Sequence, residues 1–253
     1  MRRLNIKQLI AMGILLFPLH AAQAFVVVGH ESEPFYFTDG SKGIQGACYE
    51  IIQQLCKLEA RHCKFKIAPL RLALSMIKKG EADLGCPLIN SPPRNSAFSF
   101  SRGLFKTHLY FYGLPNVAHK IQKYEDLKGL SVGVQSPSMI EVSLQRIHEF
   151  SDKSFKIMPE NTAILALRKV EKKNYQLAYV SGEMARVWLK RTHSPVIEVP
   201  QLGEDTEYSI FFSRKTISEK QFNKLQSHLT ELSKNRFLDS IAEKYQLTPL
   251  VDQ

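Results

Sequence analysis

One pattern restricts the fold of this chain more than any other: short apolar segments alternate with segments of helical periodicity. Residues 25–28 form a continuous apolar run that ends at Gly29, which indicates a buried strand. Residues 46–58 then place apolar side chains at three- and four-residue spacing, which indicates an amphipathic helix. Such alternation predicts an α/β fold, with parallel-type sheets covered by helices.

The alternation runs twice along the chain. The first run continues with expected strands at residues 63–67 and 82–88, a helix from Leu70 that ends at Gly80, and a Pro-rich turn at residues 91–93. The second run supplies expected strands at residues 130–134, 177–180 and 208–212, a helix from Met139 to His148, a helix with Asn161 as its N-cap, a helix around Trp188 and two C-terminal helices. Two successive runs predict two separate sheets.

The N-terminus has the three-part layout of a cleaved secretory signal. Basic residues precede an apolar run from Leu9 to Leu19, and Ala22-Gln23-Ala24 places small residues where a signal peptidase reads them. A membrane anchor needs about 20 apolar residues, whereas this run is shorter and contains Pro18. We expect residues 1–24 to be a signal peptide cleaved after Ala24, and the mature chain to be a soluble periplasmic protein.

The net charge bears on the class of partner. The whole chain carries a formal charge of +10, and loss of the three basic residues of the signal leaves 31 basic and 24 acidic residues. The basic residues are scattered, and no DNA- or RNA-binding motif is present, so we expect no nucleic-acid partner. A basic surface is compatible with attraction to anionic solutes.

The chain has four cysteines, Cys48, Cys56, Cys63 and Cys86. An even number in an oxidising compartment predicts two disulfides, whereas the spacing does not match a zinc ribbon or finger. Three pairings are possible. If the helix over residues 46–58 packs on its sheet, its end lies near the next strand, which favours Cys56–Cys63 and leaves Cys48 to pair with Cys86.

The sequence contains no recognisable catalytic constellation. It lacks a nucleophile elbow, a phosphate-binding glycine-rich loop and a pair of histidines on one helix face. We therefore expect no enzyme activity, no cofactor and no metal.

Several local features resemble extracellular solute-binding protein family 3, the receptors of polar amino-acid uptake. They come in family order: Glu33-Pro34-Phe35-Tyr36-Phe37, Gly46 to Glu50, Lys79-Gly80-Glu81-Ala82-Asp83, Ser91-Pro92-Pro93-Arg94, Phe100-Ser101, and Asp126-Leu127-Lys128-Gly129 with Val132-Gly133-Val134. The resemblance implies a two-lobed periplasmic-binding-protein-like fold. Lobe 1 would comprise residues 25–110 plus 208–253, lobe 2 residues 111–207, and two connecting strands near Phe111 and Tyr208 would form the hinge.

The resemblance also implies ligand-binding residues. Arg94 would hold a ligand carboxylate through two parallel hydrogen bonds, and Ser138 would donate to the same carboxylate or simply cap its helix. Ser91 lies in the same turn as Arg94, and Tyr36 or Phe37 would present a ring to the ligand, although strand alternation sends one of them into the core.

Arg71 is a candidate for a different reason. It lies at the N-terminus of an amphipathic helix, outside the apolar face, where a cation is unfavourable unless an anion is near. The nearby anion is either a ligand in the cleft or one of Glu81 and Asp83.

The chain also departs from the family pattern. The aspartate expected after the strand at residues 177–180 is replaced by Ser181-Gly182, Pro87 and Ile89 stand where small hydroxyl residues are typical, and Pro137 replaces a glycine. Glu183 and Glu31 are the remaining carboxylates that could supply the missing charge. We therefore expect anionic or aromatic carboxylates to bind in preference to zwitterionic amino acids.

These observations favour a monomeric solute-binding protein that delivers a small carboxylate-bearing solute, an amino acid or an organic acid, to an inner-membrane ABC permease or a sensor. Two alternatives stay open. One is a small lyase or dehydratase of the same fold, with Glu31, Glu183 or His30 as its acid or base. The other is a protein-binding adaptor with a vestigial cleft.

Overall fold

The computed structural model describes residues 24–250, so the expected signal lies, apart from Ala24, outside the described residues. The main sheet has ten strands, with the order β4-β1-β5-β11-β7-β10-β8-β9, and β6 and β12 pair with β11 and β7. The strands are β1 Phe25–Gly29, β4 Cys63–Ile67, β5 Leu84–Ile89, β6 Phe98–Phe100, β7 Phe105–Gly113, β8 Ser131–Gln135, β9 Lys156–Glu160, β10 Leu177–Ser181, β11 Ile197–Ser213 and β12 Thr248–Pro249. Two short strands, β2 Phe37–Thr38 and β3 Ile44–Gln45, pair separately.

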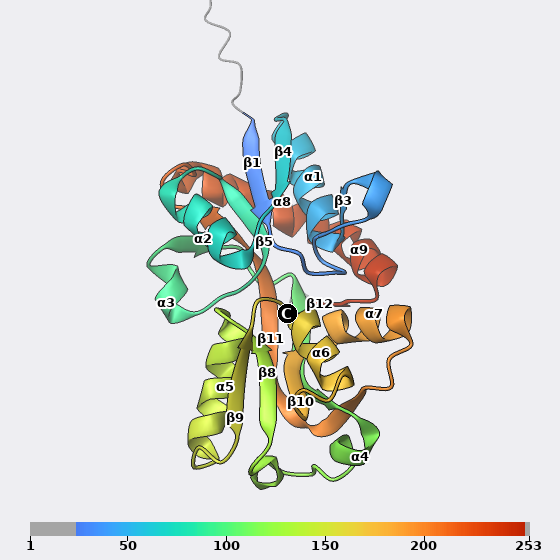
Figure 1. Cartoon of the computed structure of the whole chain (residues 1–253). Helices are drawn as coiled ribbons and strands as arrows, with labels where there is room; N and C mark the ends of the chain where they lie inside the picture. The colour runs from blue at the N-terminus through green and yellow to red at the C-terminus, as the bar shows by residue number, and fades with distance from the viewer. Residues whose placement is uncertain (1–23, 251–253) are drawn as a thin grey trace, which may run out of the picture.

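Helices cover both faces of the sheet (Figure 1). They are α1 Ala47–Leu58, α2 Leu70–Lys79, α3 Pro92–Asn95, α4 Pro115–Ala118, α5 Met139–Phe150, α6 Ala163–Glu171, α7 Gly182–Thr192, α8 Glu219–Lys234 and α9 Phe237–Tyr245. In the described part of the chain, none of these helices combines the length and apolar character that crossing a membrane requires.

The buried side chains define two lobes. Two apolar clusters contain only residues from 25–105 and 208–247, and two others contain only residues from 109–202. We call the parts of the chain around these clusters lobe 1 and lobe 2. Figure 1 shows lobe 1 above lobe 2, with β11 running through the middle of the molecule.

The expectation of two separate sheets is wrong, because β7 and β11 belong to both lobes. These strands pair antiparallel from Phe105–Tyr208 to Gly113–Ile197, with a register shift between Val199 and Gly203. β11 also pairs with β5 in lobe 1, and β7 pairs with β10 in lobe 2. Consequently the expected strand at residues 208–212 is only the final part of β11.

Both expected disulfides are present. Cys48–Cys86 joins the start of α1 to β5, and Cys56–Cys63 joins the end of α1 to the start of β4. The bridged residues lie 38 and 7 positions apart, respectively. Since a longer closed loop removes more entropy from the unfolded chain, Cys48–Cys86 is expected to stabilise lobe 1 more strongly.

Two local expectations need correction. The N-cap of α6 is Thr162 and not Asn161, because the Thr162 hydroxyl accepts a hydrogen bond from the Leu165 amide at 3.1 Å. The Pro-rich turn at residues 91–93 continues into α3, because two prolines at the first helical positions need no amide partner there.

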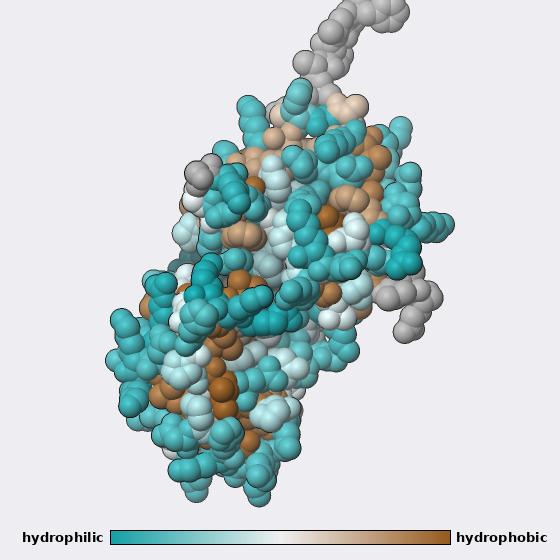
Figure 2. All heavy atoms as spheres, turned by 90° about the vertical axis from the view of Figure 1, so that its right-hand side faces the viewer, coloured by the Kyte–Doolittle hydropathy of each residue, from teal (hydrophilic) through white to brown (hydrophobic). Residues whose placement is uncertain are grey.

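Lobe 2 reaches lobe 1 directly through α7. The Arg191 guanidinium lies 2.5 Å from the Glu33 carboxylate, and Arg186 donates a hydrogen bond to the Gln246 carbonyl. Both partners belong to lobe 1. Figure 2, which faces the α7 and α9 side, shows hydrophilic side chains across the junction of the lobes.

Candidate functional site

Two neighbouring cavities lie between the lobes. The inner cavity measures about 30 Å³ and is lined by lobe 1 residues around Arg94 and by lobe 2 residues around Ser138. The outer groove measures about 740 Å³ and is lined by Arg71 and Glu31 of lobe 1 and by residues of lobe 2 near Asn161. His30, Leu70 and Gln135 line both, so the two cavities adjoin.

The two cavities lie at the edge of the sheet where an open α/β fold is expected to bind a ligand. His30 follows β1, Ile89 ends β5 and Gln135 ends β8, so all three lie at the carboxyl ends of strands. Loops and helix N-termini converge at this edge of open α/β sheets, which is where such folds bind ligands.

Arg94 is the dominant charge of the inner cavity. Its guanidinium donates to the Ile89 carbonyl at 2.8 Å, and no carboxylate of the described residues forms a salt bridge with it. Burial lowers the pKa of Arg94 to about 10, so the side chain is protonated at neutral pH. A partly buried cation without an ion-pair partner favours an anion beside it.

His30 lines the same cavity. Burial and the nearby positive charge of Arg94 lower the pKa of His30 to about 4, so the ring is neutral at pH 7. Its place directly after a buried strand is a signal that can assign it to a binding site, whereas the sequence motifs offer it only as the acid or base of an alternative enzyme function.

Ser138 lies on the opposite, lobe 2 side of the inner cavity. Its hydroxyl accepts from the Glu141 amide at 3.0 Å and donates to the Gln135 carbonyl at 2.6 Å, so it caps α5. Ser91 is buried at the start of α3, where its hydroxyl has no hydrogen-bond partner among residues 24–250, and it lies outside both cavities.

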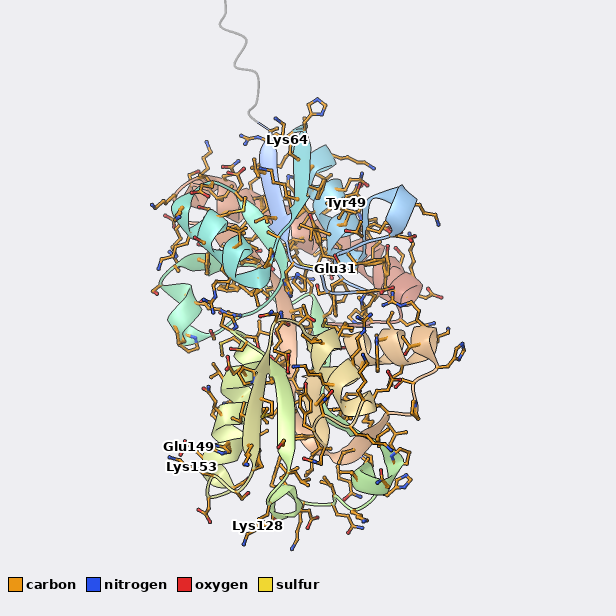
Figure 3. All side chains as sticks on the ribbon, in the orientation of Figure 1. Glu31, Tyr49, Lys64, Lys128, Glu149 and Lys153 are labelled. Carbon is orange, nitrogen blue, oxygen red and sulfur yellow. A yellow bond between two sulfur atoms is a disulfide. The ribbon has the colours of Figure 1, made fainter. Side chains whose placement is uncertain are left out.

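Arg71 lies on α2 and lines the outer groove. The two acidic residues expected as alternative partners of Arg71 interact with other groups. The Asp83 carboxylate accepts a hydrogen bond from the Val26 amide at 2.7 Å, and the Glu81 carboxylate lies 4.0 Å from the Lys79 ammonium. Glu31 also lines this groove, and its carboxylate accepts from the Thr38 amide at 3.1 Å. Figure 3 shows Glu31 at the edge of lobe 1 that faces lobe 2.

The two aromatic candidates lie outside both cavities. Tyr36 is fully buried, donates to the Lys66 carbonyl at 3.1 Å and packs on Gly29, where an added Cβ would come within 2.5 Å of its ring. Phe37 pairs with Gln45 in the small β2–β3 sheet. Tyr208, which we had treated only as a hinge residue, supplies the ring of the inner cavity.

Apolar side chains make up most of the remaining wall of the inner cavity: Leu70, Leu88, Ile89, Met139, Ile140 and Met184. Among the described residues no aspartate or glutamate lines it. Within residues 24–250, the inner cavity therefore offers one cation, several apolar groups and no carboxylate for an ammonium.

Glu183 does not replace the missing aspartate, because it faces another pocket. It lines a space of about 620 Å³ beside β7 together with Tyr110 and Tyr112, and it accepts a hydrogen bond from the Thr107 hydroxyl. Burial raises the pKa of Glu183. The next residue, Met184, lines the inner cavity, so α7 separates the two spaces.

In residues 24–250 no group of three or more His, Cys, Asp and Glu side chains has an arrangement that could hold a metal ion. The basic side chains are also dispersed: Figure 3 shows Lys64 at the outer end of lobe 1 and Lys128 and Lys153 at the outer end of lobe 2.

Residues 25–248 match the family model of the bacterial extracellular solute-binding proteins, family 3. The chain therefore belongs to this family. No curated protein sequence matches the chain.

Solved structures agree on the fold. A histidine kinase sensor domain similar to periplasmic binding proteins superposes with a TM-score of 0.82 at 15% identity, covering 91% of this chain and 99% of that one. An ancestral arginine-binding protein bound to arginine gives 0.79 at 21% identity, with 88% and 98% coverage. An ancestral amino-acid-binding protein, a precursor of cyclohexadienyl dehydratase, gives 0.76 at 18% identity, with 88% and 95% coverage. At these identities the similarity shows a shared periplasmic-binding-protein-like fold.

Proposed function

We propose that this chain is a periplasmic receptor that binds a small organic acid between its lobes. The observation that carries the proposal is the inner cavity, where the partly buried guanidinium of Arg94 has no carboxylate partner among the described residues and no acidic side chain of those residues lines the cavity. A carboxylate would compensate Arg94, whereas the ammonium of an amino acid would lose its hydration without a charged partner.

Binding requires movement of the lobes. A cavity of about 30 Å³ has room for only one or two water molecules. We infer that lobe 1, residues 25–110 plus 208–253, and lobe 2, residues 111–207, separate by bending at β7 and β11, admit the ligand through the outer groove and close around it. Ligand contacts to both lobes would favour the closed form.

The closed form would be recognised by an inner-membrane ABC permease or by a sensor, and the chain would act as a monomer. The similarity to a histidine kinase sensor domain is in keeping with a sensing role, and the amino-acid-binding neighbours are in keeping with uptake. We propose binding without catalysis.

The test is a thermal-shift screen of organic acids against the twenty common amino acids. A ligand at a hundredfold excess over its Kd stabilises the folded state by about 2.7 kcal/mol, which raises Tm by roughly 5–11 °C for a chain of this size. We expect the largest shift from an organic acid. If arginine, lysine, histidine or glutamine gives the largest shift, the proposed ligand class is wrong.

A further inference from the structure

His30 lies where the outer groove adjoins the inner cavity that holds Arg94. It is the first residue after β1 and lines both the outer groove and the inner cavity. Its ring nitrogens have no hydrogen-bond partner among the residues that the structure describes; only its backbone carbonyl is used, by the Ser32 hydroxyl at 3.2 Å. The ring is therefore free to contact a ligand.

The charged and titratable groups around His30 are few. Lobe 1 supplies Arg94 from α3, Arg71 from α2, Tyr208 from β11 and the adjacent Glu31, whose carboxylate already accepts from Thr38. Within residues 24–250, the lobe 2 side chains that line the two cavities are all uncharged, Gln135 among them. The charge that acts most strongly on the ring is that of Arg94.

We propose that His30 is a second anion-binding residue of this site and takes up one proton from bulk solvent when a carboxylate binds beside Arg94. The inference rests on the proposed function. It makes the site a two-cation site in the bound state, so a dianion gains more from binding than a monoanion of similar size.

The direction of the pH effect follows from the two causes that act on the free protein. Burial and Arg94 lower the pKa of His30 to about 4. A bound carboxylate offsets the charge of Arg94 and attracts an imidazolium, so the pKa of His30 rises in the complex. Because the complex then binds more protons than the free protein, affinity increases as pH falls through the raised pKa and levels off below about pH 4.

Isothermal titration calorimetry with benzoate and fumarate tests the inference. Both probes are fully ionised above about pH 6, so titrations at pH 6–8 in two buffers of different ionisation enthalpy measure protons taken up by the protein. We expect uptake of up to one proton, an affinity gain of up to about tenfold per pH unit on acidification, and a larger gain for fumarate. His30→Gln should bind more weakly with a flat pH profile, whereas the exposed His62→Gln should behave like the wild type.

Two contrary outcomes are distinguishable. Binding of either probe by the wild type without proton uptake, or with the same pH profile in His30→Gln, overturns the role of His30 and leaves the proposed function standing. Failure of the wild type to bind any carboxylate overturns both. Proton uptake is measured on the unmodified protein, so the test does not depend on the folding of a variant.

Discussion

The two lobes contribute different chemistry to the space between them. Within residues 24–250, every ionisable side chain that lines the inner cavity or the outer groove comes from lobe 1: His30, Glu31, Arg71, Arg94 and Tyr208. Lobe 2 contributes uncharged groups, including Ser138, Gln135 and Thr162, and the N-termini of α5 and α6. The difference suggests that lobe 1 captures the ligand by charge and that lobe 2 closes over it with hydrogen-bond donors.

The lobes also differ in their covalent reinforcement. Both disulfides lie in lobe 1, where they tie α1 to β5 and β4. Lobe 2 contains none of the four cysteines and is held by packing, hydrogen bonds and ion pairs such as Lys169–Glu160. The lobe that carries the charged groups is thus the one that disulfides cross-link, which suits a site whose cations must stay in place before the ligand arrives.

The largest expected effect concerns charge in lobe 1. Arg94→Ala removes the one cation that lines the inner cavity within residues 24–250 and is expected to weaken binding of an organic acid by about 2–5 kcal/mol, or about 30-fold to several thousandfold. Calorimetry measures the change in Kd, with the exposed Arg168→Ala of lobe 2 as the matched control. Unchanged affinity in Arg94→Ala would mean that lobe 1 does not capture the ligand through this charge.

The second effect concerns the reinforcement of lobe 1. The double variant Cys48→Ser with Cys86→Ser removes the disulfide whose cysteines lie 38 residues apart. We expect it to lower the free energy of unfolding by about 4 kcal/mol, because the unfolded chain gains loop entropy. That corresponds to roughly 8–16 °C in Tm. The pair Cys56→Ser with Cys63→Ser should have a smaller effect, about 2 kcal/mol. Calorimetric scans in which the short bridge matters more than the long one would contradict this ranking.

A smaller effect is expected from lobe 2. Ser138→Ala removes the N-cap of α5 and should lower stability by about 1 kcal/mol, or 2–4 °C in Tm. Ser218→Ala, which removes the N-cap of α8 in lobe 1, should have a similar effect on Tm. Only Ser138→Ala should also weaken ligand binding. Equal Kd values for the two variants would show that the α5 N-terminus does not contact the ligand.

The smallest effect concerns the contact between the lobes. The Arg191–Glu33 pair is partly exposed, and such pairs contribute about 0.2–1 kcal/mol. Arg191→Ala should therefore favour separation of the lobes and raise Kd by no more than about fivefold. Small-angle scattering and calorimetry measure both changes, with the exposed Lys190→Ala as the control. A tighter-binding Arg191→Ala would mean that the ion pair opposes the bound form.

The sequence predicts the elements of this fold better than their assembly. Apolar periodicity predicts the longer helices but not the short α3 and α4, Gly80 marks the end of α2, and helix–strand packing indicates the correct pairing of the cysteines. The single sheet was not predictable from local patterns, because β7 and β11 are some 90 residues apart in the chain and pair only in three dimensions.

The candidate site shows the same limit. Arg94 and Ser138 were expected at the cleft and line the inner cavity, since each lies in a motif with a defined place in the fold. Strand alternation indicates only that Tyr36 and Phe37 point to opposite sides. It does not show that Tyr36 packs on Gly29 or that Phe37 belongs to the separate β2–β3 hairpin, so it does not predict that both lie outside the cavities. Glu183 lies outside the inner cavity because it is on a different face of α7 from Met184. Which face of α7 points into that cavity depends on how α7 packs against β7, and the sequence does not show this.

Mass spectrometry of the small molecule that co-purifies with the protein from its native cells tests the central claim most directly. We expect an organic acid that carries a carboxylate and no amine, and we expect Arg94→Ala prepared in the same way to carry none of it. Recovery of an amino acid from the wild-type protein would contradict the account.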